Sequence, residues 1–323
     1  MTKIKIMLPL TMALCLFATA QVAAAQQWPA KEPIKVIVPF TPGSATDIVA
    51  RVVFNQVSKQ IGQAVVVDNR GGGGTTIGSA FVAHADPDGY TLLVNSTSHV
   101  VVASVYSHLA YNVADDFTAL TPLAAQPFVA TAPAKYKTMA DFVAYGRAHP
   151  GVLNYGSNGI GTAGQLFMVN IGLAAKITMT HVPFRGTADA LTEMISNRLD
   201  LFPAPATAMI ELAKAGKVSA LAVSIAGRSQ AMPDVPTIAE TGYPDATYNF
   251  WIGAFAPVKT PPEISARLHD EIVKALDVPE VKKEIVALAA DPMPMSMKDF
   301  DAFVRKEIKL NAGIVAAAGI QPE

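Results

Sequence analysis

The chain has 323 residues, a formal net charge of −1 at pH 7, and few charged residues, only 16% of the total. A nearly neutral chain that lacks a run of basic residues is a poor partner for nucleic acid or for an anionic membrane surface. Its length exceeds what one hydrophobic core usually serves, so we expect two domains.

The first 25 residues have the pattern of a secretory signal peptide. Lys3 and Lys5 precede an apolar run, and small residues at 23–25 follow it. The run is too short to span a membrane, and the order of charge, apolar core and small-residue exit argues against a buried helix. We therefore predict cleavage after residue 25 and a location in the periplasm. Cys15 falls inside the signal, which leaves the mature chain without a thiol for a disulfide, a nucleophile or a metal site.

Beyond the signal, strand and helix patterns alternate along the chain in two series. Apolar β-branched runs predict strands, and apolar residues spaced by three or four predict helices. In the first series, strands are predicted at 34–40, 65–68 and 91–95, with helices over 48–57 and 77–85. After about residue 125, helices are predicted at 139–148, 166–174 and 188–195, and strands at 152–155, 178–182, 199–202 and 220–223. A strand at 250–257 and helices at 262–276 and 297–317 close the chain.

This alternation predicts an α/β fold with two lobes, each a mainly parallel sheet flanked by helices, and a ligand cleft between them. The closing elements predict a return to the first lobe. We therefore expect lobe 1 to comprise residues 26–124 and 252–323, and lobe 2 to comprise residues 125–251. Ligands of such sheets bind beyond the carboxyl ends of the strands, so the loops that follow strands form the candidate site.

The loop after the first predicted strand has the features of an anion site. Ser44 and Asp47 form a Ser-x-x-Asp capping box, which places a helix N-terminus directly after Pro42 and Gly43. Free backbone N–H groups and the positive end of the helix dipole then point at one place. The plainer alternative is a helix cap without a ligand, which is what such pairs usually are.

Three more loops follow strands in the same way, at 95–99, 156–165 and 185–189. Thr162 and Gln165 suggest a second capping box. Arg185 is the only cation in these loops, and it either binds a carboxylate or pairs with a nearby acid. His99 either contacts the ligand or caps a helix, whereas His181 lies in a strand pattern typical of a buried histidine.

The sequence shows no catalytic or metal-binding pattern. It lacks G-x-S-x-G, a serine followed three residues later by lysine, and paired histidines at metal-ligand spacing. We therefore expect no enzyme activity, no catalytic residue, no metal and no cofactor. A hydrolase or lyase that uses Asp47 or His99 remains an alternative, although neither residue has an orienting partner in the sequence.

Several motifs together resemble one family. Residues 39–47 (PFTPGSATD) resemble P-[FY]-x-x-G-G-x-x-D, residues 87–92 read PDGYTL, and residues 233–237 read PDVPT. With the segments at 67–71, 153–157, 181–186 and 251–253, these look like the periplasmic solute-binding proteins of tripartite tricarboxylate transporters, the Bug or TctC family. The resemblance implies a Venus-flytrap fold that closes on a carboxylate and delivers it to integral-membrane transporter subunits. We expect a monomer, and a ligand-presenting sensor subunit for a signalling receptor is the alternative role.

The binding residues of the family transfer to loops of both lobes. The resemblance implies ligand contacts at Thr41, Gly43, Ser44, Ala45 and Asp47, at Ser157, Asn158, Thr162 and Ala163, and at Gly186, Thr187, Ala188 and Asp189. The candidate set also includes Ser96, His99, Arg185 and Ala204.

This chain departs from the family pattern at residues that would read the rest of the ligand. Ser44 replaces the usual glycine, and residues 203–206 read PAPA where many members carry an aspartate. An aspartate there would suit an ammonium group, so its loss argues against amino-acid ligands. With Arg185 nearby we predict a dicarboxylate, with aromatic acids such as terephthalate or phthalate as candidates.

Overall fold

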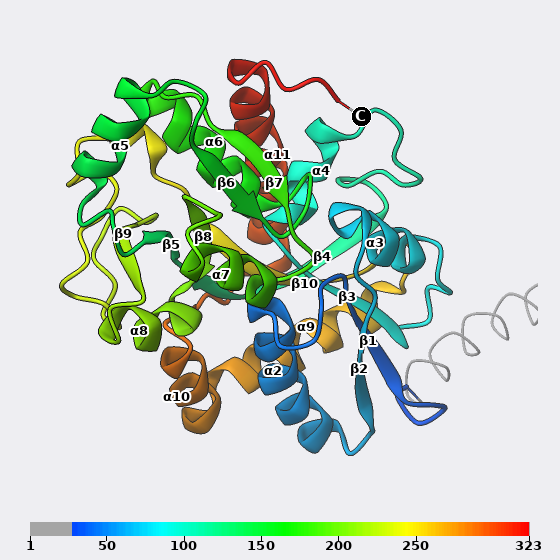
Figure 1. The fold of residues 1–323 in the computed structure, drawn as a ribbon. Coiled ribbons are helices and arrows are strands. Elements are labelled where there is room, and N and C mark those ends of the chain that lie inside the picture. The colour runs from blue at the N-terminus through cyan, green and yellow to red at the C-terminus, as the bar shows by residue number, and fades with distance from the viewer. Residues whose placement is uncertain (1–27, 323) are drawn as a thin grey trace, which may run out of the picture.

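The computed structural model describes residues 28–322, so the predicted signal peptide and Cys15 lie outside the described residues. The first group of strands comprises β1 (Ile34–Val38), β2 (Val65–Asn69), β3 (Thr91–Ser96), β4 (Phe117–Gln126), β10 (Phe250–Pro257) and β11 (Asp291–Pro292). They form one six-stranded sheet in the order β11-β4-β10-β3-β1-β2. We call this sheet and its helices lobe 1 (Figure 1).

Two sets of helices cover the two faces of the lobe 1 sheet (Figure 1). The helices are α2 (Ala45–Ile61), α3 (Thr76–Ala83), α4 (Ser98–Val105), α9 (Pro262–Asp277), α10 (Pro279–Ala287) and α11 (Met297–Ala317). On one face α2 packs against α9 and α10, and on the other face α11 packs against α4. None of the helices within residues 28–322 is long and apolar enough to cross a membrane.

The first strand shows how this sandwich follows from the sequence. Successive side chains of a strand point to opposite faces, so the part of a strand that is covered on both sides is apolar; in β1 only Lys35, near its start, is charged and exposed. In β1, Val36 belongs to the buried cluster that contains Val53 of α2, and Ile37 belongs to the cluster that contains Phe300 of α11. The β1 strand is therefore held in place by helices from both ends of the chain.

Lobe 2 is built from the middle of the chain. Its strands are β5 (Phe128–Pro133), β6 (Asn154–Ser157), β7 (Thr180–Pro183), β8 (Phe202–Pro205) and β9 (Val218–Val223). Its helices are α5 (Met139–Ala148), α6 (Ala163–Ala175), α7 (Thr187–Ile195) and α8 (Ala206–Lys214). The sheet β8-β5-β9 and the pair β6-β7 are joined by a parallel bridge between Tyr155 and Leu201.

The six-stranded sheet is mixed and the sheet β8-β5-β9 is antiparallel, which corrects the expectation of mainly parallel strands. The pairs β1-β2, β1-β3 and β6-β7 are parallel, as the βαβ pattern predicts. The strands β4 and β10 instead pair antiparallel with each other, and β5 pairs antiparallel with β8 and β9. The physical reason is that β4 and β10 carry the chain out of lobe 1 and back into it, so they run in opposite directions.

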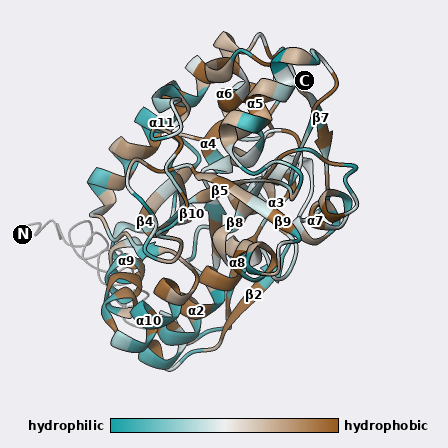
Figure 2. Ribbon diagram, turned by 60° about the vertical axis from the view of Figure 1, so that its left-hand side comes forward, coloured by the Kyte–Doolittle hydropathy of each residue, from teal (hydrophilic) through white to brown (hydrophobic). Residues whose placement is uncertain are grey.

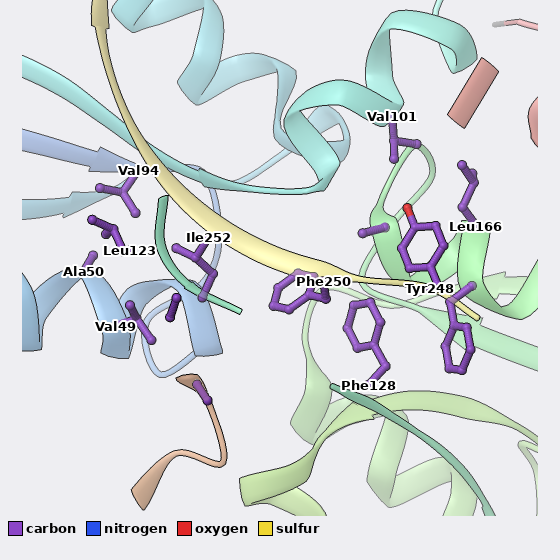
Figure 3. Close-up of a cluster of buried hydrophobic side chains, with 14 of the residues drawn as sticks. Val49, Ala50, Val94, Val101, Leu123, Phe128, Leu166, Tyr248, Phe250 and Ile252 are labelled. Atoms are coloured by element: carbon purple, nitrogen blue, oxygen red, sulfur yellow. The ribbon is translucent and has the colours of Figure 1, made fainter. Parts of the chain in front are cut away.

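The two lobes share buried side chains at this crossing. One residue, Pro127, separates β4 from β5, and Phe128 packs against Phe250 with ring centroids 4.5 Å apart. Figure 3 shows these two rings between Ile252 on the lobe 1 side and Leu166 on the lobe 2 side. The crossing is therefore packed as part of a continuous core and not as an open linker.

The outer helices are amphipathic. In α9 the residues Ile264, Leu268, Ile272 and Ala275 recur every three or four positions and are buried against the sheet side. Figure 2 shows hydrophilic residues along the outer surface of α9 and α10, away from the sheet.

Candidate ligand-binding cleft

Five helices begin around one narrow pocket between the lobes. The first residues of four of them line this pocket: Ala45 of α2, Ser98 of α4, Ala163 of α6 and Thr187 of α7. Pro205, which precedes the first residue of α8, lines it too. Each helix N-terminus carries backbone N–H groups without intrahelical partners and the positive end of a dipole. The arrangement is suited to an anion.

The pocket is the innermost part of a cleft with three connected parts. The inner pocket has a volume of about 40 Å³, enough for a small polar group such as a carboxylate but not for a whole organic acid. An outer cavity of about 500 Å³ extends to the glycine run 71–74 and Phe184, and a rim cavity of about 240 Å³ extends over residues 186–189. Phe40 and Asn158 line all three parts, so a ligand can extend from one into the next.

Most of the residues predicted from the sequence line this cleft. Those in the inner pocket are Ser44, Ala45, Ser96, Asn158, Thr162, Ala163 and Thr187. Those in the outer or rim cavity include Thr41, Gly43, Arg185, Gly186, Ala188 and Asp189. Four predicted residues, Asp47, His99, Ser157 and Ala204, line none of the three parts. Their positions show other roles.

Asp47 organises the loop between β1 and α2. Its carboxylate accepts hydrogen bonds from the Gly43 N–H at 2.9 Å, from Asn69 Nδ2 at 2.9 Å and from Arg51 Nε at 3.0 Å. The Ser44 hydroxyl caps α2 by accepting from the Asp47 N–H, which is one half of the predicted capping box; the carboxylate of Asp47 accepts from the Gly43 N–H and not from that of Ser44. Burial alone would raise the pKa of Asp47, but the hydrogen bonds from Arg51, Gly43 and Asn69 hold it below its usual value. Asp47 is therefore an ionised clamp on the loop.

Glycine is required at the turn of this loop. Gly43 has φ +79°, a left-handed conformation that residues with a Cβ rarely adopt. The turn directs the Gly43 N–H to Asp47 and leaves Ser44 and Ala45 at the inner pocket.

The loop between β6 and α6 is organised differently from the predicted capping box. The Thr162 hydroxyl donates to Gly159 O at 2.7 Å and does not cap α6. Gln165 Oε1 accepts from the Gly161 N–H at 2.8 Å, one residue earlier than a capping box requires. The buried Ser157 hydroxyl also donates to Gly159 O, at 2.8 Å. The loop is thus held by hydrogen bonds between uncharged groups, and the buried Ser157 hydroxyl fixes its backbone at Gly159.

His181 completes this network. Because Ser157 donates to Gly159 O, the Nε2–H tautomer of His181 is the one that donates to Ser157 Oγ, at 2.7 Å. Its Nδ1 then accepts from Gln165 Nε2 at 3.3 Å, and its ring stacks on Tyr155 with centroids 4.9 Å apart. Burial lowers the pKa of His181 to about 4, so the ring is neutral at pH 7. The Ser157–His181 pair is structural, since the hydroxyl is fully buried.

The position of His99 corrects the expectation of a ligand contact. Its ring is fully buried in lobe 1, with centroids 4.9 Å from Phe117 and 4.4 Å from Phe255. Burial lowers the pKa of His99 to about 3, so this ring is also neutral. His99 cannot act as a base on a ligand in the cleft. Ala204 is also fully buried, while Pro205 beside it faces the inner pocket.

Sequence reasoning misses several lining residues. Phe40, Phe184 and Ser98 line the cleft next to residues that the sequence predicts. Ser98 lies in a predicted loop, whereas Phe40 ends a predicted strand and Phe184 falls between a predicted strand and a predicted loop. No signal in the sequence tells which of these side chains turns toward a cavity.

Arg185 is the only cationic residue among those that line the three parts of the cleft. It lies in both the outer and the rim cavity, and none of the ion pairs formed within residues 28–322 uses it. Within the same residues, no group of three or more His, Cys, Asp or Glu side chains is arranged to hold a metal ion.

Comparisons with known proteins agree with this geometry. The family model described as tripartite tricarboxylate transporter family receptor matches residues 49–320. A relative from Pseudomonas sp. strain P51, a UPF0065 protein of the tcbD-tcbE intergenic region, is 38% identical over 79% of this chain and 77% of its own length. The match over most of the chain confirms the resemblance found in the sequence.

Two solved structures share the fold and carry ligands. Rpa4515 of R. palustris, solved with adipate, is 30% identical and superposes with a TM-score of 0.86 over 92% of this chain and all of its own. MatC of Rhodopseudomonas palustris, solved with bound malate, is 30% identical with a TM-score of 0.83 over 89% of this chain and all of its own. The predicted two-lobed α/β binding-protein fold is thereby confirmed.

Proposed function

We propose that this protein captures an organic dicarboxylate between its lobes. The chain belongs to the tripartite tricarboxylate transporter receptor family, and the proposal starts from that membership. The mature protein, residues 26–323, would act in the periplasm and hand the ligand to the membrane subunits of a transporter. The binding unit would comprise lobe 1, residues 26–124 and 252–323, and lobe 2, residues 125–251.

The convergence of helix N-termini at the inner pocket is the observation that carries this proposal. The first residues of α2 and α4 come from lobe 1 and those of α6 and α7 from lobe 2. A carboxylate held there would accept N–H and hydroxyl donors from both lobes and so stabilise the arrangement in which the lobes meet. No lysine or arginine lines the inner pocket, so its attraction for anions rests on dipoles and hydroxyl groups.

Arg185 and the outer cavity support a second carboxylate and a sizeable body. The guanidinium of Arg185 can hold a carboxylate bidentately, and its partner would lie at the far end of a ligand anchored in the inner pocket. Phe40 and Phe184 line the outer cavity and suit an apolar or aromatic body between the two acids. Adipate and malate, which two similar proteins bind, are both dicarboxylates. Terephthalate and phthalate are the aromatic candidates.

A sensor role would use the same cleft and differs only in the partner, a signalling receptor in place of a permease. Enzyme activity is disfavoured by the site itself, because His99 is buried away from the cleft and Asp47 is engaged with Gly43, Arg51 and Asn69.

The direct test is ligand binding by the mature protein. Thermal shift and calorimetry would be run with adipate, malate, succinate, citrate, phthalate, terephthalate, benzoate, aspartate and glutamate. A dose-dependent rise in melting temperature with dicarboxylates, weaker for benzoate and absent for the amino acids, is expected. No shift with any carboxylate would refute carboxylate binding. Loss of uptake of the bound acid in cells that lack the gene would support transport, and loss of a transcriptional response alone would support the sensor role.

A further inference from the structure

Ser98 occupies a position that no motif in the sequence singles out as a ligand contact. It is the first residue of α4, its surface is 2% exposed, and it lines the inner pocket from the lobe 1 side. Its neighbours Ser96 and His99 are the contacts that the sequence predicts. Of these, Ser96 lines the same pocket and His99 points into the core.

The hydroxyl of Ser98 joins the two lobes. Ala163, the first residue of α6 in lobe 2, donates its backbone N–H to Ser98 Oγ at 3.0 Å. Thr162, which precedes it, uses its hydroxyl on Gly159 O and leaves α6 without a side-chain cap of its own. Ser98 therefore caps a helix of the opposite lobe.

The Ser98 hydroxyl can also act as a hydrogen-bond donor. Ser96 Oγ accepts from the Ser98 N–H at 3.2 Å and donates its own proton to Ser98 Oγ at 3.1 Å. With the bond from Ala163, both lone pairs of Ser98 Oγ are engaged. Either hydroxyl of the Ser96–Ser98 pair can donate to the other, and in the arrangement in which Ser96 donates, the Ser98 proton is available to a ligand in the inner pocket that the residue lines.

Other contacts show that the lobes meet at this loop. The Tyr106 hydroxyl of lobe 1 donates to Ile160 O of lobe 2 at 3.3 Å. The backbone of Gly74 lies so close to the same carbonyl that an added Cβ would clash with it. Ser98 is distinguished from Tyr106 and Gly74 because it bridges the lobes inside the inner pocket.

We propose that Ser98 donates a hydrogen bond to the ligand carboxylate while it accepts from Ala163, so that one hydroxyl couples ligand binding to lobe closure. This inference rests on the proposed function. A chain of donors from the Ala163 N–H through the Ser98 hydroxyl to a carboxylate strengthens each bond in turn. The chain is complete only when the lobes are together, so a bound carboxylate favours the closed arrangement.

The test compares Ser98→Ala with two controls by calorimetry, with adipate and terephthalate as probes. Ser98→Ala should weaken binding about 10- to 100-fold, the range for losing a hydrogen bond to a charged group. Tyr106→Phe removes a bond between the lobes but no donor in the pocket, so a loss of about threefold or less is expected. Ser58 lies on α2 and its hydroxyl donates to Gln63 O, beyond the end of the helix, so Ser58→Ala should bind as the wild type does.

The outcomes separate this inference from the proposed function. If the wild type binds neither these probes nor any other carboxylate, the proposed function fails and the inference with it. If the wild type binds and Ser98→Ala binds within twofold, only the role of Ser98 is refuted. An equal loss in Tyr106→Phe would reduce Ser98 to a lobe contact. Melting temperatures without ligand show whether Ser98→Ala folds, and Ser98→Cys, which keeps the volume with a weak donor, replaces it if not.

Discussion

The two loops that face each other across the cleft are stabilised differently, one by a charged side chain and the other by neutral ones. The lobe 1 loop at 39–47 is fixed by an ionised carboxylate, Asp47, which is bonded to Arg51 and Asn69. The lobe 2 loop at 157–165 is fixed by neutral groups, with His181 bonded to Ser157 and Gln165. Both present helix N-termini to the same pocket. Two helix N-termini at one pocket are thus held by a charged group in one lobe and by an uncharged network in the other.

The largest effect is expected from breaking the charged clamp. Asp47→Ala removes the acceptor of three hydrogen bonds and frees the Gly43 turn, so we expect a loss of about 2 kcal/mol in the free energy of unfolding. Binding of a dicarboxylate should weaken at least about tenfold, because Ser44 and Ala45 lose their position at the pocket. Urea unfolding and calorimetry measure the two effects.

The control for this clamp is Asp68→Ala. Asp68 pairs with Arg70 on the surface, with both side chains 39% exposed, so its loss should cost less than about 0.5 kcal/mol and leave binding unchanged. If the two variants behaved alike, Asp47 would be an ordinary surface acid and not the organiser of the loop.

The second prediction uses pH to separate the loops. Burial lowers the pKa of His181 from 6.5 to about 4. Between pH 6.5 and 4, His181 is therefore protonated in the unfolded chain but neutral in the folded chain. This contribution to stability is complete above pH 6.5 and is lost as the pH falls toward 4, by at most about 1.4 kcal/mol per pH unit for one group. Because the pKa of Asp47 lies below its usual value, its contribution is lost only as the pH falls below about 4.

The lobe 2 loop should therefore loosen at a higher pH than the lobe 1 loop. Urea unfolding at pH 7, 5.5 and 4.5 should show a shallower pH dependence for His181→Gln, which keeps a donor for Ser157 but does not titrate. An unchanged slope in His181→Gln would show that this histidine binds a proton equally well in the folded and the unfolded chain, which would refute the lowered pKa.

The third prediction concerns the far end of the ligand. Arg185→Ala should weaken binding of adipate or terephthalate about tenfold and leave benzoate within twofold, because only a dicarboxylate reaches Arg185 from the inner pocket. Arg198→Ala, which removes an exposed arginine paired with Glu193 on the same lobe, should change neither. A similar loss for benzoate and adipate would place Arg185 at the first carboxylate.

The sequence predicts best what depends on neighbouring residues. The predicted strand at 250–257 and helices at 139–148 and 297–317 match β10, α5 and α11 in their bounds. The two helices are capped by the local pairs Thr138–Asp141 and Ser296–Asp299. The strands β4 and β5 escape prediction, because Thr118, Thr121 and Pro122 break up the apolar pattern of β4 and Pro127 follows it directly. These strands are fixed by pairing with strands far along the chain.

For the site, the sequence locates the loops but not the direction of each side chain. Residues 95–99 are predicted to form a loop, whereas α4 begins at Ser98. Neighbours on a helix are turned about 100° apart, which places Ser98 at the pocket and His99 in the core. Asp47 and Ser157 likewise turn away from the cleft to hold its loops, since a buried polar group must find partners within the fold.

The smallest effect is expected from His99→Phe, which tests this assignment of α4. His99 packs between Phe117 and Phe255 and lines no part of the cleft, so binding should stay within twofold of the wild type. A phenyl ring of similar size should change the free energy of unfolding at pH 7 by less than about 1.5 kcal/mol. Because burial lowers the pKa of His99 to about 3, the variant should also lose less stability than the wild type between pH 6.5 and 4. Binding that weakened tenfold at unchanged stability would return His99 to the site and exchange the roles of Ser98 and His99.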